Sequence, residues 1–117
     1  MKSKDLIRLK HMLDSTQAIL GFLQGKKRSD LDDDRLLISG ITRELEILGE
    51  AAGKVSLPTQ KLFSEIPWRG LVGMRNRLIH AYFDVDREIV WNTITNDLPI
   101  FYKELEKAVS QMNSVEK

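Results

Sequence analysis

Apolar residues recur every three or four positions along most of the chain, which predicts helices rather than strands. The first predicted helix runs from about Asp5 to Gln24, with Ser3 or Asp5 as its cap. Its leucines fall on one face: Leu6, Leu9, Leu13 and Leu20. His11 projects from the opposite side and is therefore expected at the surface.

The second predicted helix begins at Ser29, with Ser29 or Asp30 as its cap, and continues to about Ala52. Its apolar stripe consists of Leu37, Ile38, Ile41, Leu45, Leu48 and Ala52. Gly53 is interpreted as the residue that stops the helix. The consecutive aspartates Asp32–Asp34 can be read as a metal site or as charges that suit a helix start. The second reading is favoured, because the run lacks the glycine and the distal glutamate of a calcium loop.

A connector and a third main helix follow. Two of the three prolines lie within Val55–Pro67, which predicts a connector with at most a short helix around Thr59–Phe63. Pro67 suits the first turn of the third main helix, which runs from Trp68 towards a turn at Asp84–Asp86. The apolar face of this helix is broad and consists of Trp68, Leu71, Val72, Leu78, Ile79, Tyr82 and Phe83.

The last predicted helix is capped by Asp86, and Val85 and Val90 are placed as a hydrophobic staple. Pro99 is expected to kink this helix. Its apolar stripe consists of Val90, Trp91, Ile94, Leu98, Phe101, Leu105, Val109 and Met112. No strand alternation, repeat or low-complexity tract interrupts the pattern. We therefore predict a single all-α domain over residues 1–117, an up-down bundle of four main helices plus a short connector helix.

Composition narrows the possible functions without selecting one. The 117 residues contain no cysteine, which excludes disulfides and thiolate metal sites and fits a reducing cytoplasm. Charge is nearly balanced, with 18 Lys and Arg against 17 Asp and Glu, so nucleic-acid binding would need a local basic patch. The basic stretch Gly25–Ser29 is either a solvated turn or such a phosphate-contacting edge. No apolar run reaches the length of a membrane span.

The third main helix carries polar side chains where a core helix would have aliphatic ones. Arg75 falls in the middle of its apolar face, and Asn76 and His80 are neighbours on one shoulder of that face. Tyr82 follows on the same side as Arg75. Each residue also has a structural reading, such as an arginine held by the carboxylate of Glu44 or a histidine satisfied in packing. Together, a fixed cation, an amide, a group that titrates near neutrality and a phenol suit a phosphodiester better than a core.

These residues carry a resemblance to a known family. Residues 75–82, R-N-R-L-I-H-A-Y, fit the Arg-x4-His-x-Tyr motif of the HepT-like toxins, small all-helical ribonucleases of the HEPN superfamily. The stretches Glu44–Ala52, Ile66–Asp86 and Val90–Pro99 are similar to the same family. The resemblance implies an HEPN-like bundle with endoribonuclease activity that needs no metal and no cofactor.

The resemblance also implies roles and partners. Arg75 would bind the phosphate of an RNA substrate, Asn76 would orient it, and His80 would act as acid or base. One chain offers a single well-placed histidine, whereas a symmetric homodimer would bring two together around one phosphate. HepT-like toxins share such a composite dimer cleft and are typically encoded beside a small nucleotidyltransferase antitoxin. That antitoxin neutralises the toxin by transferring AMP to the motif tyrosine, here Tyr82.

A second class of function fits the same residues. Every residue of the motif could serve binding alone, in a non-catalytic helical module that binds nucleotide or a nucleotidyltransferase partner through the same cleft. Incubation of the purified protein with total RNA distinguishes the two classes, because only the first predicts cleavage.

Overall fold

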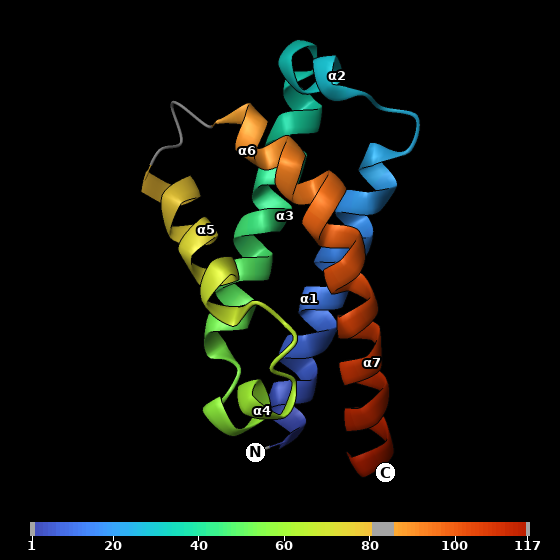
Figure 1. Cartoon of the computed structure of the whole chain (residues 1–117), viewed down its shortest axis with the longest axis vertical. Helices are drawn as coiled ribbons and strands as arrows, with labels where there is room; N and C mark the ends of the chain where they lie inside the picture. Colours follow the sequence, from blue (N-terminus) through green and yellow to red (C-terminus); the bar gives the residue numbers. More distant parts are fainter. Residues whose placement is uncertain (1, 81–85, 117) are drawn as a thin grey trace.

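The computed structural model describes the backbone of residues 2–80 and 86–116 and the side chains of residues 4–77 and 86–114. Every regular element in these ranges is a helix (Figure 1). The elements are α1 (Lys2–Leu23), α2 (Arg28–Asp33), α3 (Arg35–Lys54), α4 (Leu57–Leu62), α5 (Trp68–His80), α6 (Arg87–Asn92), the π-helical segment η1 (Thr93–Asp97) and α7 (Leu98–Glu116). The predicted all-α fold is confirmed. None of these helices is long and apolar enough to cross a lipid bilayer.

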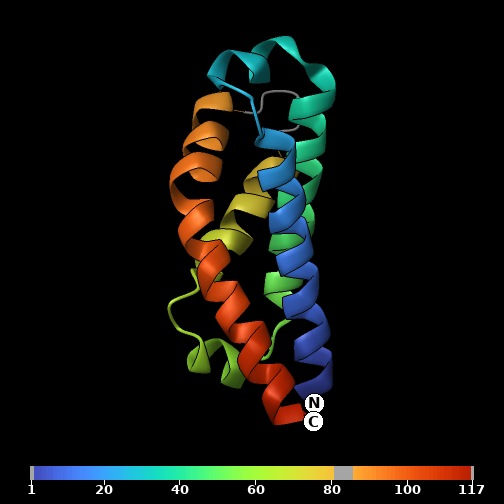
Figure 2. The same ribbon diagram turned by 90° about the vertical axis from the view of Figure 1, so that its right-hand side faces the viewer.

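Three long helices form the body of the molecule. α1 packs against both α3 and α7, and all three run along the long axis in the two views (Figures 1 and 2). α5 packs against α3, and α6, η1 and α7 follow one another along the same side of the bundle (Figure 1). Fully buried aliphatic side chains fill the space between the long helices, among them Leu9, Met12, Ile19, Ile41, Leu45, Leu48, Ile94 and Leu105.

The predicted second helix is divided at Asp34 into α2 and α3. Asp34 has extended backbone angles (φ −112°, ψ 98°), and its side chain accepts a hydrogen bond from the Leu37 amide at 3.1 Å. Asp30 accepts one from the Lys27 amide at 2.8 Å in the first turn of α2. The prediction that Ser29 or Asp30 caps one continuous helix was therefore wrong. The short side chain of aspartate satisfies free amides at a helix start better than it suits a helix interior.

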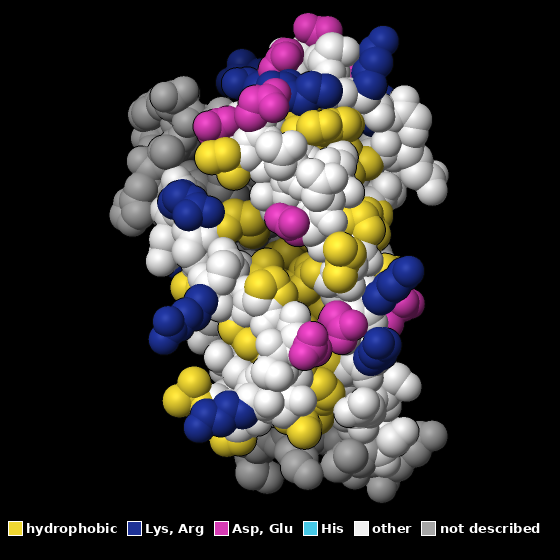
Figure 3. Space-filling model, viewed as in Figure 1, with side chains coloured by type: hydrophobic (Ala, Val, Ile, Leu, Met, Phe, Trp, Pro, Cys, Tyr) yellow, Lys and Arg dark blue, Asp and Glu magenta, His cyan; other side chains and the backbone are white. Residues whose placement is uncertain are grey.

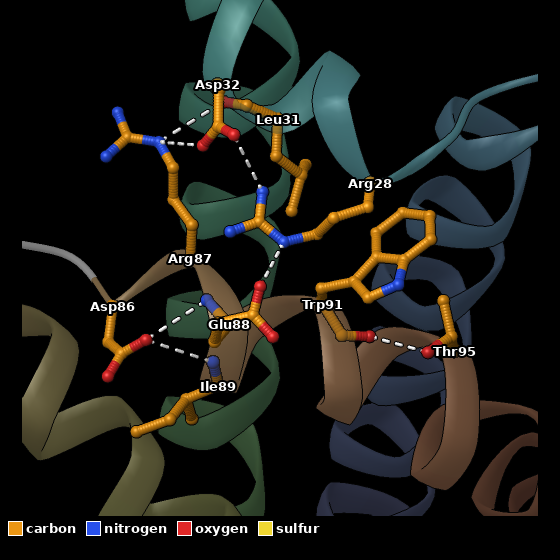
Figure 4. Close-up of polar contacts among 9 residues, drawn as sticks. All are labelled: Arg28, Leu31, Asp32, Asp86, Arg87, Glu88, Ile89, Trp91 and Thr95. Atoms are coloured by element: carbon orange, nitrogen blue, oxygen red, sulfur yellow. Dashed lines mark hydrogen bonds and ion pairs between the residues drawn. The ribbon is translucent and has the colours of Figure 1, made fainter.

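Ion pairs join α2 to α6 (Figure 4). Arg28 Nε lies 2.6 Å from Glu88 Oε1, and Arg28 Nη1 lies 3.1 Å from Asp32 Oδ2. Arg87 Nε donates to the Leu31 carbonyl oxygen at 3.2 Å and lies 3.7 Å from Asp32 Oδ1. Arg28, the first residue of α2, is thus engaged by carboxylates rather than free for a phosphate contact. Lys26 and Lys27 before it are exposed, as expected of a solvated turn.

Asp5 joins α1 to α4 instead of capping its own helix, which begins earlier, at Lys2. The buried Asp5 carboxylate accepts hydrogen bonds from the Ser56 amide at 3.0 Å, the Ser56 hydroxyl at 2.5 Å and the Thr59 hydroxyl at 2.5 Å. Burial opposes ionisation, but these hydrogen bonds favour the carboxylate and hold the pKa of Asp5 below its ordinary value of 3.8. They also place the connector helix, which begins at Leu57 rather than at the predicted Thr59.

The C-terminal helical path changes its hydrogen-bonding pattern before Pro99. η1 is a π-helical segment, and the Leu98 amide donates to the carbonyl oxygen of Thr93, five residues earlier. Pro99 has no amide hydrogen to continue the ladder, so the irregularity lies immediately before it. The predicted cap of α6 is confirmed, since Asp86 Oδ1 accepts from the amides of Glu88 at 3.0 Å and Ile89 at 3.2 Å (Figure 4). Val85 of the predicted staple lies outside the described residues.

Candidate functional site

The first half of α5 is firmly anchored to the rest of the protein. Trp68, Leu71 and Met74 are buried, although Met74 was not part of the predicted apolar face. The Trp68 indole Nε1 donates to the carbonyl oxygens of Gln60 and Phe63, both at 3.1 Å. An aromatic side chain with its polar group satisfied in this way ties the start of α5 to α4 and to the residue that follows it.

α5 crosses α3 in direct contact at Gly49. A Cβ atom added to Gly49 would collide with Cβ of Arg75 and would lie 2.7 Å from the Leu71 carbonyl oxygen. Only a residue without a side chain allows the two helices to approach so closely. The aliphatic part of Arg75 is therefore packed against α3, which explains how an arginine occupies an otherwise apolar face.

The guanidinium of Arg75 is only partly satisfied. Its Nε atom is buried and has no hydrogen-bond partner among the described residues. Its Nη1 atom donates to Oδ1 of the adjacent Asn76 at 3.4 Å, at the exposed side of the helix. The side chain of Asn76 is exposed. The shielded Nε leaves the two terminal nitrogens as the edge of this guanidinium that can meet an anion.

α5 is strongly cationic for its length. Its sequence contains three arginines and no acidic residue. Within the described part of the chain, no ion pair involves Arg69, Arg75 or Arg77. The nearly balanced charge of the whole protein therefore conceals a local excess of positive charge on this helix, although Arg75 and Arg77, two residues apart, face different sides of it.

The structure brings some of the predicted site residues together and not others. Arg75 and Asn76 meet on α5, and His80 is the last residue of this helix, one turn after Asn76. The side chain of His80 and the whole of Tyr82 lie outside the described residues. His11, which was excluded from the site, is exposed as predicted.

Glu44, the candidate partner of Arg75 in the sequence analysis, forms no ion pair with it among the described contacts. Glu44 is five residues before Gly49, where α5 crosses, so its backbone is displaced by about 7.5 Å along α3. Five residues also turn Glu44 about 140° around the helix axis from Gly49. The apolar stripe of α3 alone could not show which of these positions α5 would meet.

A groove lies on the other side of α5, between this helix and the η1–α7 path. It has a volume of about 500 Å³ and is lined by Leu71, Met74, Arg77, Thr93, Asp97, Leu98, Ile100, Phe101 and neighbouring residues. Figure 3 shows hydrophobic side chains gathered in a hollow on this face, with acidic side chains at its border. Arg75 and Asn76 do not line the groove, so the sequence-predicted site and the groove occupy different sides of one helix.

Comparison with known proteins connects this arrangement to a family. Residues 12–108 match the family described as Ribonuclease HepT-like. A protein of Caldanaerobacter subterraneus subsp. tengcongensis named "Putative RNase" is 35% identical over 109 residues, which cover 93% of this chain and 94% of that protein. The "Probable ribonuclease HepT" of Thermococcus cleftensis is 43% identical over 67 residues, covering 57% of this chain and 61% of its own. No solved structure shows a significant match to this chain.

The described helices define the class of all-helical bundle proteins, here with the arginine-bearing helix α5 packed against α3. Within that class, this chain belongs to the HepT-like ribonuclease family. The HEPN-like fold and the ribonuclease class expected from the sequence are thus confirmed at the level of the family.

Proposed function

We propose that the protein is an endoribonuclease whose site is built on α5 around Arg75. The observation that carries the proposal is the cationic helix itself, with three arginines that form no ion pair in the described part of the chain. Arg75 is pressed against α3, and its Nη1 atom donates to Asn76 at the exposed side of the helix. A cation fixed in this way, with no ion-pair partner among the described residues, suits the charge that develops on a phosphorus atom during cleavage.

The proposed reaction needs no metal, because RNA supplies its own nucleophile. The 2′-oxygen attacks the adjacent phosphorus and forms a cyclic phosphate, while the bond from phosphorus to the 5′-oxygen breaks. A base removes the proton of the 2′-hydroxyl, and an acid gives a proton to the departing 5′-oxygen. His80 is assigned to this proton transfer, Arg75 to binding the phosphate through two hydrogen bonds, and Asn76 to orienting it.

We assign the two proton transfers to two copies of the chain. His80 is the histidine of the motif, and one imidazole does not readily act as base and acid in a single concerted step. A two-fold symmetric dimer would place two copies of α5 around one scissile phosphate. The active form is therefore proposed to be a homodimer with a composite site.

The cellular role is proposed to be that of a toxin held inactive by a nucleotidyltransferase antitoxin. In this proposal the Tyr82 hydroxyl oxygen attacks the α-phosphate of ATP, pyrophosphate leaves, and AMP remains attached to the tyrosine. The added phosphate is an anion that would satisfy Arg75, and the adenosine would obstruct the path of RNA. The support is the resemblance of residues 75–82 to the Arg-x4-His-x-Tyr motif.

The test is RNA cleavage by purified protein in the presence of EDTA. We expect the wild type to cut total RNA and to leave cyclic phosphate and 5′-hydroxyl ends, and we expect His80→Ala to lose on the order of 10²–10⁴-fold in rate. His11→Ala is the matched control, because His11 is exposed on α1, and it should cleave as the wild type does. Cleavage by His80→Ala at the wild-type rate would overturn the assigned chemistry, and an inert wild type would favour a binding module.

A further inference from the structure

The crossing of α3 and α5 depends on one glycine more than on any other in the described helices. A Cβ at Gly49 would meet Cβ of Arg75 and the backbone of Leu71, with the Leu71 carbonyl oxygen 2.7 Å away and Arg75 Cγ 3.1 Å away. Gly53, one turn later on α3, has room for a methyl group, because its nearest neighbour would be Val72 Cγ2 at 3.5 Å. The two glycines lie on similar faces of one helix and differ in what they contact.

The contacts at Gly49 cannot be relieved by a side-chain rotation. They involve Cβ of Arg75 and a main-chain oxygen, which move only when the helix α5 itself moves. Helices pack closely and have no spare volume at such a crossing. A methyl group at Gly49 would therefore displace α5 from α3, and it would displace Arg75 with it.

The same close approach shapes what Arg75 can offer a ligand. Its Nε atom is buried and has no described partner, whereas Nη1 reaches Asn76 at 3.4 Å. The stem is thus fixed by α3, and the guanidinium has Nε buried and Nη1 at the exposed side of the helix. An anion would be held end-on by the two terminal nitrogens rather than by the pair that includes Nε.

We propose that Gly49 is a positioning residue, which sets the place and the direction in which the Arg75 guanidinium meets the phosphate of the RNA. This inference rests on the proposed ribonuclease function for its effect on rate. The geometric part, that Gly49 sets the position of the Arg75 stem from which Nε extends, holds independently of any activity.

The experiment compares Gly49→Ala with Gly53→Ala, the same substitution one turn away. Alanine favours a helix over glycine in both variants, so a loss of activity in only one of them is not a propensity effect. We expect Gly49→Ala to remain folded and to lose on the order of 100-fold in kcat, as a displacement of about 1 Å at a reacting group can cause. Gly53→Ala should match the wild type.

A double-mutant cycle separates positioning from a general structural role. If Gly49 acts through Arg75, then adding Gly49→Ala to Arg75→Lys should cost no more than about 2-fold beyond Arg75→Lys alone, because coupled residues are not additive. A full additional loss in the double variant would overturn the inference, as would a wild-type kcat in Gly49→Ala.

A second readout does not require activity. In nitrogen-15 NMR spectra the Arg75 Nε–H signal, identified by its loss in Arg75→Lys, should exchange slowly with water and should shift in Gly49→Ala but not in Gly53→Ala. If Gly49→Ala does not fold, the wild type decides, since an Nε–H that exchanges as fast as that of the exposed Arg77 contradicts the burial on which the inference depends. A wild type that shows the slow signal but cuts no RNA refutes the proposed function and leaves the positioning intact.

Discussion

Arg75 is the residue on which the proposed chemistry depends most directly. Its stem is held by Gly49, so the position of the charge is set by packing as well as by sequence. We predict that Arg75→Lys loses on the order of 10²–10³-fold in kcat/KM, because an ammonium group cannot reproduce the planar pair of donors. Arg69→Lys is the control, since Arg69 is exposed on the same helix. Activity retained in Arg75→Lys would assign the arginine a structural role.

Tyr82 belongs to the proposed regulation rather than to cleavage. We predict that Tyr82→Phe cuts RNA as the wild type does but escapes inactivation by the nucleotidyltransferase with ATP and magnesium, because it lacks the hydroxyl that accepts AMP. Intact-mass spectrometry of both chains after this incubation is the measurement. A wild-type chain that gains no AMP, or a Tyr82→Phe chain that gains it equally, would refute the proposal.

At the scale of elements, Asp5 shows how one polar group can join two helices. Its carboxylate holds the start of α4 through Ser56 and Thr59. We predict that Asp5→Asn lowers the free energy of unfolding at pH 7 by about 1–3 kcal/mol, as measured by urea unfolding, because hydrogen bonds to a buried charge are lost or weakened. Asp14→Asn, an exposed aspartate on the same helix, is the control and should change little.

The stability of the fold is also expected to depend on pH through the carboxylate of Asp5. The pKa of Asp5 is lowered from 3.8 in the folded protein, so its ionised form stabilises the fold above that value. This stabilisation is lost as the pH falls through the folded-state pKa. The stability difference between wild type and Asp5→Asn should therefore shrink below pH 3.8, and a difference that stays constant there would contradict this account.

At the scale of the whole molecule, the proposed site is complete only in a dimer. We predict that wild-type chains mixed and refolded with an excess of His80→Ala chains lose more activity than dilution explains, because mixed dimers carry one histidine instead of two. Light scattering gives the oligomeric state, and titration of the variant gives the activity curve. Mixing with His11→Ala chains is the control and should not lower the activity. A fully active monomer at micromolar concentration would refute the composite site.

Local pattern was sufficient to predict which parts of the chain are helical. The apolar periodicity and the absence of strand alternation predicted a helical bundle. The polar residues of α5 stood out because they occupy positions where this periodicity predicts apolar side chains. The cap at Asp86 was also readable, since a cap and the amides that it accepts lie within one turn. The break at Asp34 was missed because several neighbouring aspartates compete for one local role.

Contacts between distant parts of the chain were decided only when the helices packed. Asp5 meets Ser56 across 51 positions, and the crossing of α5 at Gly49 rather than beside Glu44 depends on the turn at which two helices meet. Periodicity specifies which face of a helix is buried, but it leaves the shift along the axis open. The motif and the chemistry that it implies could therefore be predicted from the amino-acid sequence. The contact that holds Arg75 against Gly49 could not, because it arises from close packing between two helices whose relative position the sequence leaves open.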